Sequence, residues 1–545
     1  MDWADELAAS VEGPQVVNDS KTPSGTVHVG SLRGPVTVDV IWRAVRKRGL
    51  EAHFLYGVED LDAMDNQSLL AGDAVERYMG VPLGRVPDQA GDCHPSYAHH
   101  FMADFLGTFE RLGIRPELYW MSELYAAGAI DPYVRLALDR AEQVRAIYRR
   151  VSNVEKPAGW LPVQPICERC GRVGTTIAKD WDGGTVRYEC RADLVAWARG
   201  CGNKGRISPF GGAATLPWNL EWAAQWGHFG VTIEPCGKDL STAGGSRDRS
   251  DAIAREVFDR EPPLNVPYEF LNVGGRKMST SKGRGTPAHV IAEVLPPEQL
   301  RFLFLRTRPN TAIEFDPDGT DAIPRLFDEF DRVADAAAGR PVRGSLPPTP
   351  ERVFAFASVT TDPAEIAARA AAFRMPFGHV AFLVQQPGID EAALRERVSI
   401  EKGSPLTTLE SELLEERARS ARRWLDTYAP DSARIRVRRD MVPPEAAALE
   451  VGQRSFLAAL SATADGDRNG ASPAGDAWQA RIFETATALG LPAGQAFAAI
   501  YLSFLGRPNG PRAGWLLASL DREFVVARLR AAASAPASAS GGRAS

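Results

Sequence analysis

A glycine-rich turn near the N-terminus constrains the fold of this chain more than any other feature. Residues 15–18 predict a short buried strand, and "NDSKTPSGTVHVGSLRG" (18–34) follows with glycines at 25, 30 and 34. Residues 31–48 then carry apolar side chains close to a 3.6-residue period and end in Arg-Lys-Arg before a glycine, which is typical of a helix C-terminus. Residues 52–58 predict a second buried strand. Strand, turn, helix and strand in this order predict a parallel α/β sheet.

The sheet is expected to resume after an interruption. Residues 96–113 and 132–150 have helical patterns, and a cysteine-rich segment at 166–204 then breaks the periodicity. Further predicted strands lie at 231–234 and 269–272, with a helix at 248–258 between them. The cysteine-rich segment is therefore interpreted as an insertion into a Rossmann-like domain.

The last third of the chain is rich in alanine and predicts helices only. A helical stretch at 297–306 leads into "GRPVRGSLPPTP" (339–350), whose prolines and glycines indicate a linker. The predicted loop at 463–475 interrupts this part, and the low-complexity tail at 531–545 is expected to be disordered. The helices are expected at 363–373, 407–428, 443–463, 475–489, 494–505 and 519–532.

Composition excludes several classes of protein. The formal net charge of −6 gives no global basic field that would attract nucleic acid, although a local basic face remains compatible with it. The first residues lack the pattern of a secretion signal, and no apolar run of about eighteen residues predicts a membrane span. Six cysteines in 545 residues are too few for a disulfide scaffold. We therefore expect a cytoplasmic, multidomain protein that does not bind membranes.

The glycine turn suggests close approach of the backbone to a phosphate, but common phosphate loops do not fit. Gly25 and Gly30 have P-loop spacing, yet Ser31 stands where that loop needs its lysine, and the spacing also differs from the dinucleotide fingerprint. A tight turn that binds nothing is the alternative. A second stretch, "NVGGRKMSTSKGRG" (272–285), offers two lysines and three hydroxyls, which suit a pyrophosphate leaving group.

These two stretches together resemble a known family. His28-Val-Gly-Ser31 resembles the first signature of class I aminoacyl-tRNA synthetases, and Lys277-Met-Ser-Thr-Ser281 resembles the second. Several further stretches resemble the class I lysyl-tRNA synthetases, and the resemblance runs from about residue 14 to about residue 530. These stretches are "TPSG" (22–25), "LPWNLEWAAQW" (216–226), "GKDLSTAGGSRD" (237–248), "VPYEF" (266–270), "LRFLFLRTRPNTAIEFD" (300–316), "WLDTYAP" (424–430) and "FAAIYLSFLGRPNGPRAG" (497–514).

The resemblance implies a two-step reaction. ATP and Mg²⁺ would activate L-lysine to lysyl-adenylate with release of pyrophosphate, and the lysyl group would then pass to tRNA(Lys). The implied catalytic residues are His28, Lys277 and Lys282. The implied ATP-binding residues are Pro23, Gly25, His28, Gly30, Ser31, Lys277, Ser279 and Ser281. The second signature departs from the family at Thr280, where many members have lysine.

Selection of lysine requires an acidic or carbonyl-rich recess for the ammonium and aromatic walls for its methylene stem. The resemblance implies that the pocket contains Ser20, Thr22, Trp218, Asp239 and Tyr268. Two positions depart from the family, because Ser20 replaces a glycine and Leu240 replaces a histidine. Ordinary core packing is the alternative for Trp218 and Tyr268.

The clustered cysteines predict a metal site. Cys167, Cys170, Cys190 and Cys201 can supply four thiolates to a structural Zn²⁺, although the last interval, of ten residues, is longer than the usual two to four. The alternative is a degenerate site with free thiols. The segment "DCHPSYAHHF" is interpreted either as a second metal site or as partly exposed helix histidines. Its candidate ligands are Cys93, His94, His99 and His100.

Local basic charge predicts where RNA would bind. Eight arginines with Trp424 and Tyr428 among them fall within 23 residues, and a solvated charged face is the alternative. The resemblance implies that the helical C-terminal half reads the anticodon, and that Arg301, Arg306 and Arg308 meet the acceptor stem. The arginines of the run are Arg417, Arg419, Arg422, Arg423, Arg434, Arg436, Arg438 and Arg439.

The predicted organisation follows from these parts. Residues 1–285 would form the catalytic domain with the zinc-ribbon-like insertion at 166–204, and residues 286–345 a stem-contact and linker region. Residues 346–530 would form the α-helical anticodon-binding domain, and 531–545 the tail. A lysine–tRNA ligase is the leading hypothesis, as a monomer. The alternatives are a paralogue that adenylates lysine or a related amino acid for a non-tRNA acceptor, and a non-catalytic zinc-containing RNA-binding protein.

Overall fold

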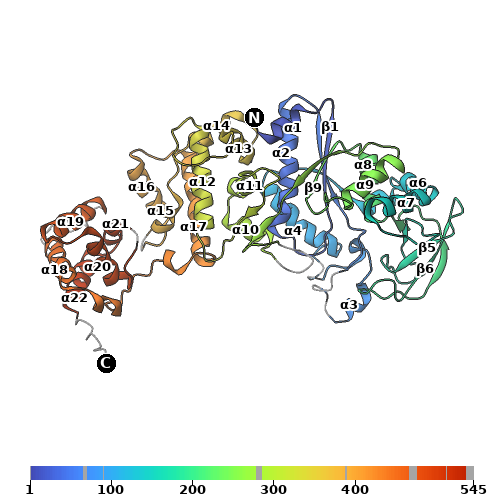
Figure 1. The fold of residues 1–545 in the computed structure, drawn as a ribbon. Helices are drawn as coiled ribbons and strands as arrows, with labels where there is room; N and C mark the ends of the chain where they lie inside the picture. The colour runs from blue at the N-terminus through green and yellow to red at the C-terminus, as the bar shows by residue number, and fades with distance from the viewer. Residues whose placement is uncertain are drawn as a thin grey trace. The chain divides into compact units, whose positions relative to one another are not determined.

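The structure, a computed structural model, describes most of the chain as two compact units (Figure 1). The described residues are 2–65, 70, 72–89, 91, 93–277, 285–386, 389–465, 475–510 and 512–535. The predicted site residues Ser279, Ser281 and Lys282 lie outside them, as do Thr280 and the tail beyond 535. Unit 1 comprises residues 1–317 and 325–372, and unit 2 comprises residues 318–324 and 373–545. These units differ in extent from the predicted parts, whose functions remain predictions.

A five-stranded, wholly parallel sheet forms the centre of unit 1, as predicted. Its strand order is β10-β9-β1-β2-β3, and Gln15 pairs with Ala52 at the start of β1 and β2. The strands are β1 (Gln15–Lys21), β2 (Ala52–Val58), β3 (Glu117–Trp120), β9 (Ile233–Gly237) and β10 (Leu264–Tyr268). Because β1 is flanked by β2 on one side and β9 on the other, the chain reverses its winding direction at β1, where ligands bind in open α/β sheets.

The predicted strand at 269–272 was misplaced. The sheet strand is β10, and the following β11 (Leu271–Val273) belongs to a separate small sheet with β12 (Arg276–Lys277) and β13 (Ile313–Glu314). Pro267 lies within β10 and makes that segment look unlike a strand. The position at the sheet edge tolerates the missing backbone donor, since an edge strand does not need every N–H.

Helices cover both faces of the sheet. Leu55 and Tyr56 are neighbours in β2 and point to opposite faces. Leu55 lies in a buried cluster with residues of α8, whereas the ring of Tyr56 packs 5.0 Å from that of Phe109 in α4. The predicted apolar face of the first long helix is confirmed, because all five of its apolar positions are fully buried. These are Leu32, Val36, Val40, Ile41 and Val45.

The remaining helices of unit 1 refine the predicted pattern. The predicted helix at 132–150 is two helices, because the backbone breaks at Arg140. Helices at 322–337 and 350–357 were not predicted, and the predicted linker at 339–350 lies between them within unit 1. The helices are α1 (Trp3–Ala9), α2 (Arg33–Lys47), α3 (Asp73–Tyr78), α4 (Tyr97–Arg111), α5 (Met121–Ala126), α6 (Asp131–Asp139), α7 (Ala141–Ser152), α8 (Trp218–Phe229), α9 (Ser246–Glu256), α10 (Ala288–Val294), α11 (Pro297–Leu305), α12 (Ala322–Ala337), α13 (Pro350–Ala357) and α14 (Pro363–Ala371).

The cysteine-rich segment is an insertion with its own small sheet, as predicted. It consists of the antiparallel strands β5 (Thr176–Lys179), β6 (Val186–Cys190) and β7 (Lys204–Ile207). The short pair β4 (Gln164–Pro165) and β8 (Ala214–Thr215) joins its two ends. The insertion therefore begins and ends at one place in unit 1.

The regular elements among the described residues of unit 2 are helices, and its core includes the fully buried Trp478, Phe456 and Phe504. Most of the predicted loop at 463–475 lies outside the described residues. Among the residues described, no single helix has both the length and the apolar composition to cross a membrane, although the bent pair α19 and α20 passes the same test together. The helices are α15 (Phe377–Leu383), α16 (Glu391–Lys402), α17 (Thr408–Thr427), α18 (Val451–Asp465), α19 (Gly475–Ala488), α20 (Ala493–Leu505), α21 (Ala513–Ala518) and α22 (Arg522–Ser534).

Candidate active site

The glycine turn joins β1 to the short 3-10 helix η1 (Val29–Leu32), which continues into α2. Gly25 has φ of 144°, a left-handed conformation that favours glycine. His28 is half-buried and lies immediately before η1, where its carbonyl accepts a hydrogen bond from the Ser31 amide at 3.0 Å. The turn therefore presents His28 and the backbone of Gly30 at the start of a helical segment, which favours anions.

The glycine turn contacts the segment that follows the second predicted signature. The amide of Val29 donates to the carbonyl of Thr286 at 2.9 Å, and the amide of Ala288 donates to the carbonyl of Val27 at 3.0 Å. His28 and Pro287 form a bridge between these segments. Residues 286–288 follow the second signature directly, whose last residues lie outside the description. Of Lys277 the backbone is described, in β12, where it pairs with Asn272.

A cavity of about 440 Å³ opens at the carboxyl ends of β1 and β2. Two of the residues predicted for the amino-acid pocket, Thr22 and Trp218, line it. Asp62 and Glu221 line it as well, and sequence reasoning missed both. The Thr22 hydroxyl donates to the Asp62 carboxylate at 2.6 Å. The cavity thus has an acidic lining and an aromatic side chain, the two features expected of a lysine pocket.

The carboxyl groups of this cavity are strongly perturbed by burial. Burial, and next the charge of Glu59, raise the pKa of Asp62 to about 7. Burial and the neighbouring Glu59 also raise the pKa of Glu221 well above its ordinary value. The Tyr125 hydroxyl donates to Glu221 at 2.6 Å, and the amide of Gln225 donates to Glu59 at 3.0 Å. Because an opposite charge favours the ionised form, a cation entering the cavity would lower these raised pKa values and pair with the carboxylates.

Ser20, Asp239 and Tyr268, the other predicted pocket residues, do not line this cavity. They lie at or just beyond the ends of β1, β9 and β10. The Tyr268 hydroxyl lies against Gly34, where an added Cβ would come within 3.0 Å of it and within 2.3 Å of an Asp19 carboxylate oxygen. Their contact with substrate remains a prediction.

A chain of buried hydrogen bonds connects the sheet to α8, the helix that lines the cavity. The carboxylate of Glu234 in β9 accepts hydrogen bonds from Asn18 at 2.8 Å and from the indole of Trp222 at 2.9 Å. The Tyr119 hydroxyl in turn donates to Asn18 at 3.1 Å. Burial raises the pKa of Glu234 to about 8. Both carboxylate oxygens have donors, so the chain fixes α8, which carries Trp218 and Glu221, relative to the sheet.

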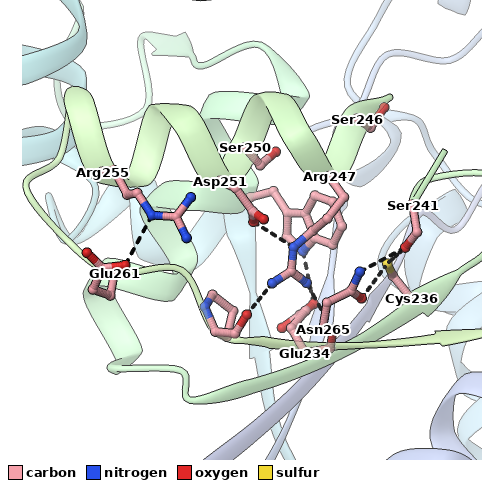
Figure 2. A network of polar contacts seen from close by, with 12 residues as sticks. Glu234, Cys236, Ser241, Ser246, Arg247, Ser250, Asp251, Arg255, Glu261 and Asn265 are labelled. Carbon is pink, nitrogen blue, oxygen red and sulfur yellow. Dashed lines mark hydrogen bonds and ion pairs between the residues drawn. The ribbon is translucent and has the colours of Figure 1, made fainter. Parts of the chain in front are cut away.

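Arg247 of α9 completes this support (Figure 2). Its side chain is almost completely buried and donates to Asp251 at 2.6 Å and to the carbonyl of Glu234 at 3.1 Å. It also donates to the carbonyl of Pro263, just before β10. The guanidinium lies 4.7 Å from the ring centre of Trp226. One arginine therefore connects α8, α9, β9 and the chain entering β10.

The four predicted metal-binding cysteines converge. The ligand atoms of Cys167, Cys170, Cys190 and Cys201 all lie within 4.8 Å of one another. The Cys167 and Cys201 sulfurs are 3.6 Å apart, and the Cys201 amide points at the Cys190 sulfur at 3.3 Å. Gly171, with φ of 71°, follows the second cysteine in a left-handed turn. Four convergent sulfurs with an amide donor fit a tetrahedral thiolate-binding metal.

A second cluster forms in the segment where the alternative site was considered, but its composition differs. Asp88, Cys93, His94 and His100 place their ligand atoms within 4.8 Å of one another. His99 is not a member, because its ring stacks on Trp120 at 4.1 Å and bonds to Ser96. Asp88 takes its place, with a carboxylate oxygen 3.1 Å from the Cys93 sulfur and 3.3 Å from His100 Nδ1.

Four of the side chains predicted to contact RNA are buried instead. Arg301 is fully buried and bonds to Asp39 at 2.5 Å and to the carbonyls of Phe356 and Leu112. In unit 2, Arg417 is buried and donates to the Met375 carbonyl at 2.5 Å. Trp424 and Tyr428 are buried too, so neither presents a face to bases. The exposed arginines that remain candidates are Arg308, Arg419, Arg423, Arg436, Arg438 and Arg439.

Comparison with known proteins identifies a matching family and curated relatives over nearly the whole chain. A family described as "tRNA synthetases class I (K)" matches residues 1–346. The lysine–tRNA ligase of Methanosarcina barkeri is 32% identical over 97% of this chain and 97% of its own length. That of Archaeoglobus fulgidus is 33% identical over 98% of this chain and 100% of its own. The glutamate–tRNA synthetase structure from Elizabethkingia anophelis covers 96% of this chain and 100% of its own, with a TM-score of 0.43 and 13% identity.

Proposed function

This chain belongs to the class I tRNA synthetases of the lysine type, and from that premise we propose that it is a lysine–tRNA ligase. In the first step, a carboxylate oxygen of L-lysine attacks the α-phosphorus of ATP, and the bond to pyrophosphate breaks. In the second step, a hydroxyl of the terminal ribose of tRNA(Lys) attacks the lysyl carbonyl, and AMP leaves. Both steps depend mainly on positioning and on stabilisation of charge.

The observation that carries this proposal is the acidic cavity beside the glycine turn. Thr22 links the cavity to the glycine turn. It directly follows the last residue of β1, at the start of the turn, and its hydroxyl donates to the Asp62 carboxylate at 2.6 Å. Asp62 and Glu221 would receive the lysine side-chain ammonium, and Trp218 would pack against its methylene stem. Glu221 is buried and Asp62 is half-buried, so both carboxylates lose hydration on folding, and a bound ammonium would supply a partner in place of that water.

ATP would occupy the region of the glycine turn. Gly25 and Gly30 carry no side chain that would block close approach of a phosphate to the backbone, and His28 can donate to a phosphate oxygen as charge develops there. The hydrogen bonds between residues 27–29 and 286–288 support this assignment, since they hold the segment that follows the second signature against the glycine turn. Lys277, Lys282, Ser279 and Ser281 would then neutralise and orient the pyrophosphate. Mg²⁺ would accompany ATP as its counterion.

We further propose that both four-residue clusters bind Zn²⁺. Four thiolates at Cys167, Cys170, Cys190 and Cys201 form a donor set suited to a closed structural site. The mixed sulfur, nitrogen and oxygen donors of the Asp88 cluster also suit zinc. The first metal would join two loops to the end of β6, which carries Cys190, and the second would join a loop to the start of α4, which carries His100. Transfer to tRNA would involve unit 2, whose exposed arginines between 419 and 439 are candidates for phosphate contacts.

The experiment that tests the proposed reaction is amino-acid-dependent exchange of labelled pyrophosphate into ATP with the purified full chain. Exchange should require L-lysine and should be absent with the other nineteen amino acids. Lysine-dependent exchange without any charging of total tRNA would instead support the paralogue with another acceptor, which Ser20 and Leu240 motivate. Absence of exchange with every amino acid would refute both enzyme hypotheses and favour the RNA-binding alternative.

A further inference from the structure

The long interval between Cys190 and Cys201 contributes to the cavity wall. Four residues of the insertion, Val173, Gly174, Val195 and Trp197, line the same cavity as Thr22 and Trp218. Val195 and Trp197 lie between Cys190 and Cys201, in the ten-residue interval that is longer than a metal site needs. The extra length therefore has a consequence besides metal binding, because it delivers side chains to the cavity.

This loop is closed and anchored. The Gly200 amide donates to the Arg191 carbonyl at 3.1 Å, and the Arg191 amide donates to the Thr175 carbonyl at 2.8 Å. The Gly200 position has no room for a side chain, because an added Cβ would lie 2.3 Å from the Arg191 carbonyl oxygen. Ala198 is buried in a cluster with Met64 and other residues after β2. The loop is thus tied at its base and packed at its far side, so its side chains have defined positions.

Packing fixes the position of the Trp197 ring within the loop. Its ring edge rests on Gly174, where an added Cβ would lie 2.3 Å from Trp197 Cη2. Trp197 is nevertheless 37% exposed, which is unusual for a tryptophan. A large aromatic surface is therefore left uncovered at the wall of an acidic cavity, where it can contact an alkyl chain or a cation.

The insertion is also clamped to the rest of unit 1. Arg172, two residues after a cysteine of the cluster, donates to the carbonyl of Met79 at 2.7 Å and to the carbonyl of Glu76 at the end of α3. The Val173 amide donates to the Gly80 carbonyl at 2.8 Å. Gly174 shortly follows Cys170, and Trp197 shortly precedes Cys201. The Trp197 ring and the glycine on which it packs therefore both lie in segments that carry cysteines of the cluster.

We infer that the loop between Cys190 and Cys201 is a specificity element of the amino-acid pocket, in which Trp197 contacts the side chain of bound lysine. This inference rests on the proposed function. A metal on the four cysteines would then hold a wall of the substrate pocket in addition to stabilising the insertion. Trp197 adds a second aromatic wall to that of Trp218, and the two come from segments far apart in the chain.

The test compares Trp197→Ala, Trp197→Phe and Trp181→Ala with the wild-type full chain. Trp181 is the matched control, because it is a partly buried tryptophan of the same insertion and does not line the cavity. Calorimetry measures the Kd of L-lysine without turnover, and atomic absorption measures the metal content of each variant. We expect Trp197→Ala to raise the Kd of lysine about tenfold with unchanged metal content, since it removes one aromatic contact. Trp197→Phe should stay within about threefold of wild type.

The outcomes separate this inference from the proposed function. Equal lysine affinity in wild type and Trp197→Ala, with lysine-dependent exchange intact in both, would overturn the role of Trp197 alone. An equal loss in Trp181→Ala and Trp197→Ala would overturn it as well, because the loss would then reflect damage to the insertion. A wild-type chain that neither binds lysine nor supports exchange would refute the proposed function itself. If Trp197→Ala fails to fold, Trp197→Phe and Trp197→Leu carry the comparison, and equal affinity in these two refutes an aromatic contact.

Discussion

Replacement of Asp62 by asparagine should change stability and activity in opposite directions. Asp62 lines the cavity, accepts a hydrogen bond from Thr22 at 2.6 Å, and has its pKa raised by burial from 3.8 to about 7. An unfolded aspartate ionises near 3.8 and the folded one near 7, so ionisation disfavours the folded state progressively as the pH rises between these values and fully above 7. The difference corresponds to about 4 kcal/mol.

Asparagine keeps an oxygen for the Thr22 hydroxyl but carries no charge. The free energy of unfolding of the ligand-free Asp62→Asn protein should therefore rise by up to about 4 kcal/mol at pH 8, and by about 2 kcal/mol at pH 5. Loss of the partner for the lysine ammonium should raise the KM for lysine by about 100-fold or more, since truncating one member of a buried charge pair costs about 3–5 kcal/mol. The KM for ATP should change little.

Urea unfolding at the two pH values and lysine-dependent ATP–pyrophosphate exchange measure these effects. Asp65→Asn is the matched control, because Asp65 lines the same cavity but is exposed to solvent. Asp65→Asn should change the free energy of unfolding and the KM for lysine far less than Asp62→Asn does. A KM for lysine within threefold of wild type in Asp62→Asn would refute the assignment of Asp62 to the ammonium.

Four further results are expected. The Kd of lysine in calorimetry should rise by about tenfold per pH unit below 7, because ionised Asp62 is the binding form; a flat profile would contradict this. Lys277→Ala should slow adenylate formation in rapid-quench kinetics far more than it weakens lysine binding, and equal losses would argue against a transition-state contact. Cys201→Ser should lower the metal content by about one ion per chain, whereas Cys236→Ser, outside both clusters, should not. Arg301→Ala should lower the free energy of unfolding by about 3–5 kcal/mol because it leaves buried Asp39 short of a partner, and a stable variant with weaker tRNA binding would reverse that assignment.

Local patterns were sufficient for the core of unit 1. The strand, glycine turn, helix and strand of residues 15–58 follow from periodicity and capping residues alone, and all five apolar positions of the helix are buried as expected. The edge strand β10 was misplaced because Pro267 disfavours a strand locally, and only its place at the sheet edge makes it acceptable.

Side-chain roles that depend on tertiary burial were harder to predict. Arg301 and Trp424 belong to segments with binding-like composition, yet both are buried, and no local pattern reveals that. Asp62 was identifiable in principle, because it lies just past the carboxyl end of β2, next to the phosphate turn at the end of β1. Glu221 could have been found from Trp218, which precedes it by three residues on the same helix face.

The most direct test of the proposed function is the charging of unfractionated tRNA by the wild-type chain with each of the twenty labelled amino acids. Lysine alone should become attached, in an ATP-dependent reaction that releases pyrophosphate, and the product should be lysyl-tRNA(Lys). Attachment of a different amino acid would contradict the assignment of the acidic cavity to lysine. Lysine-dependent pyrophosphate exchange with no charged tRNA would contradict the assignment of tRNA as the acceptor.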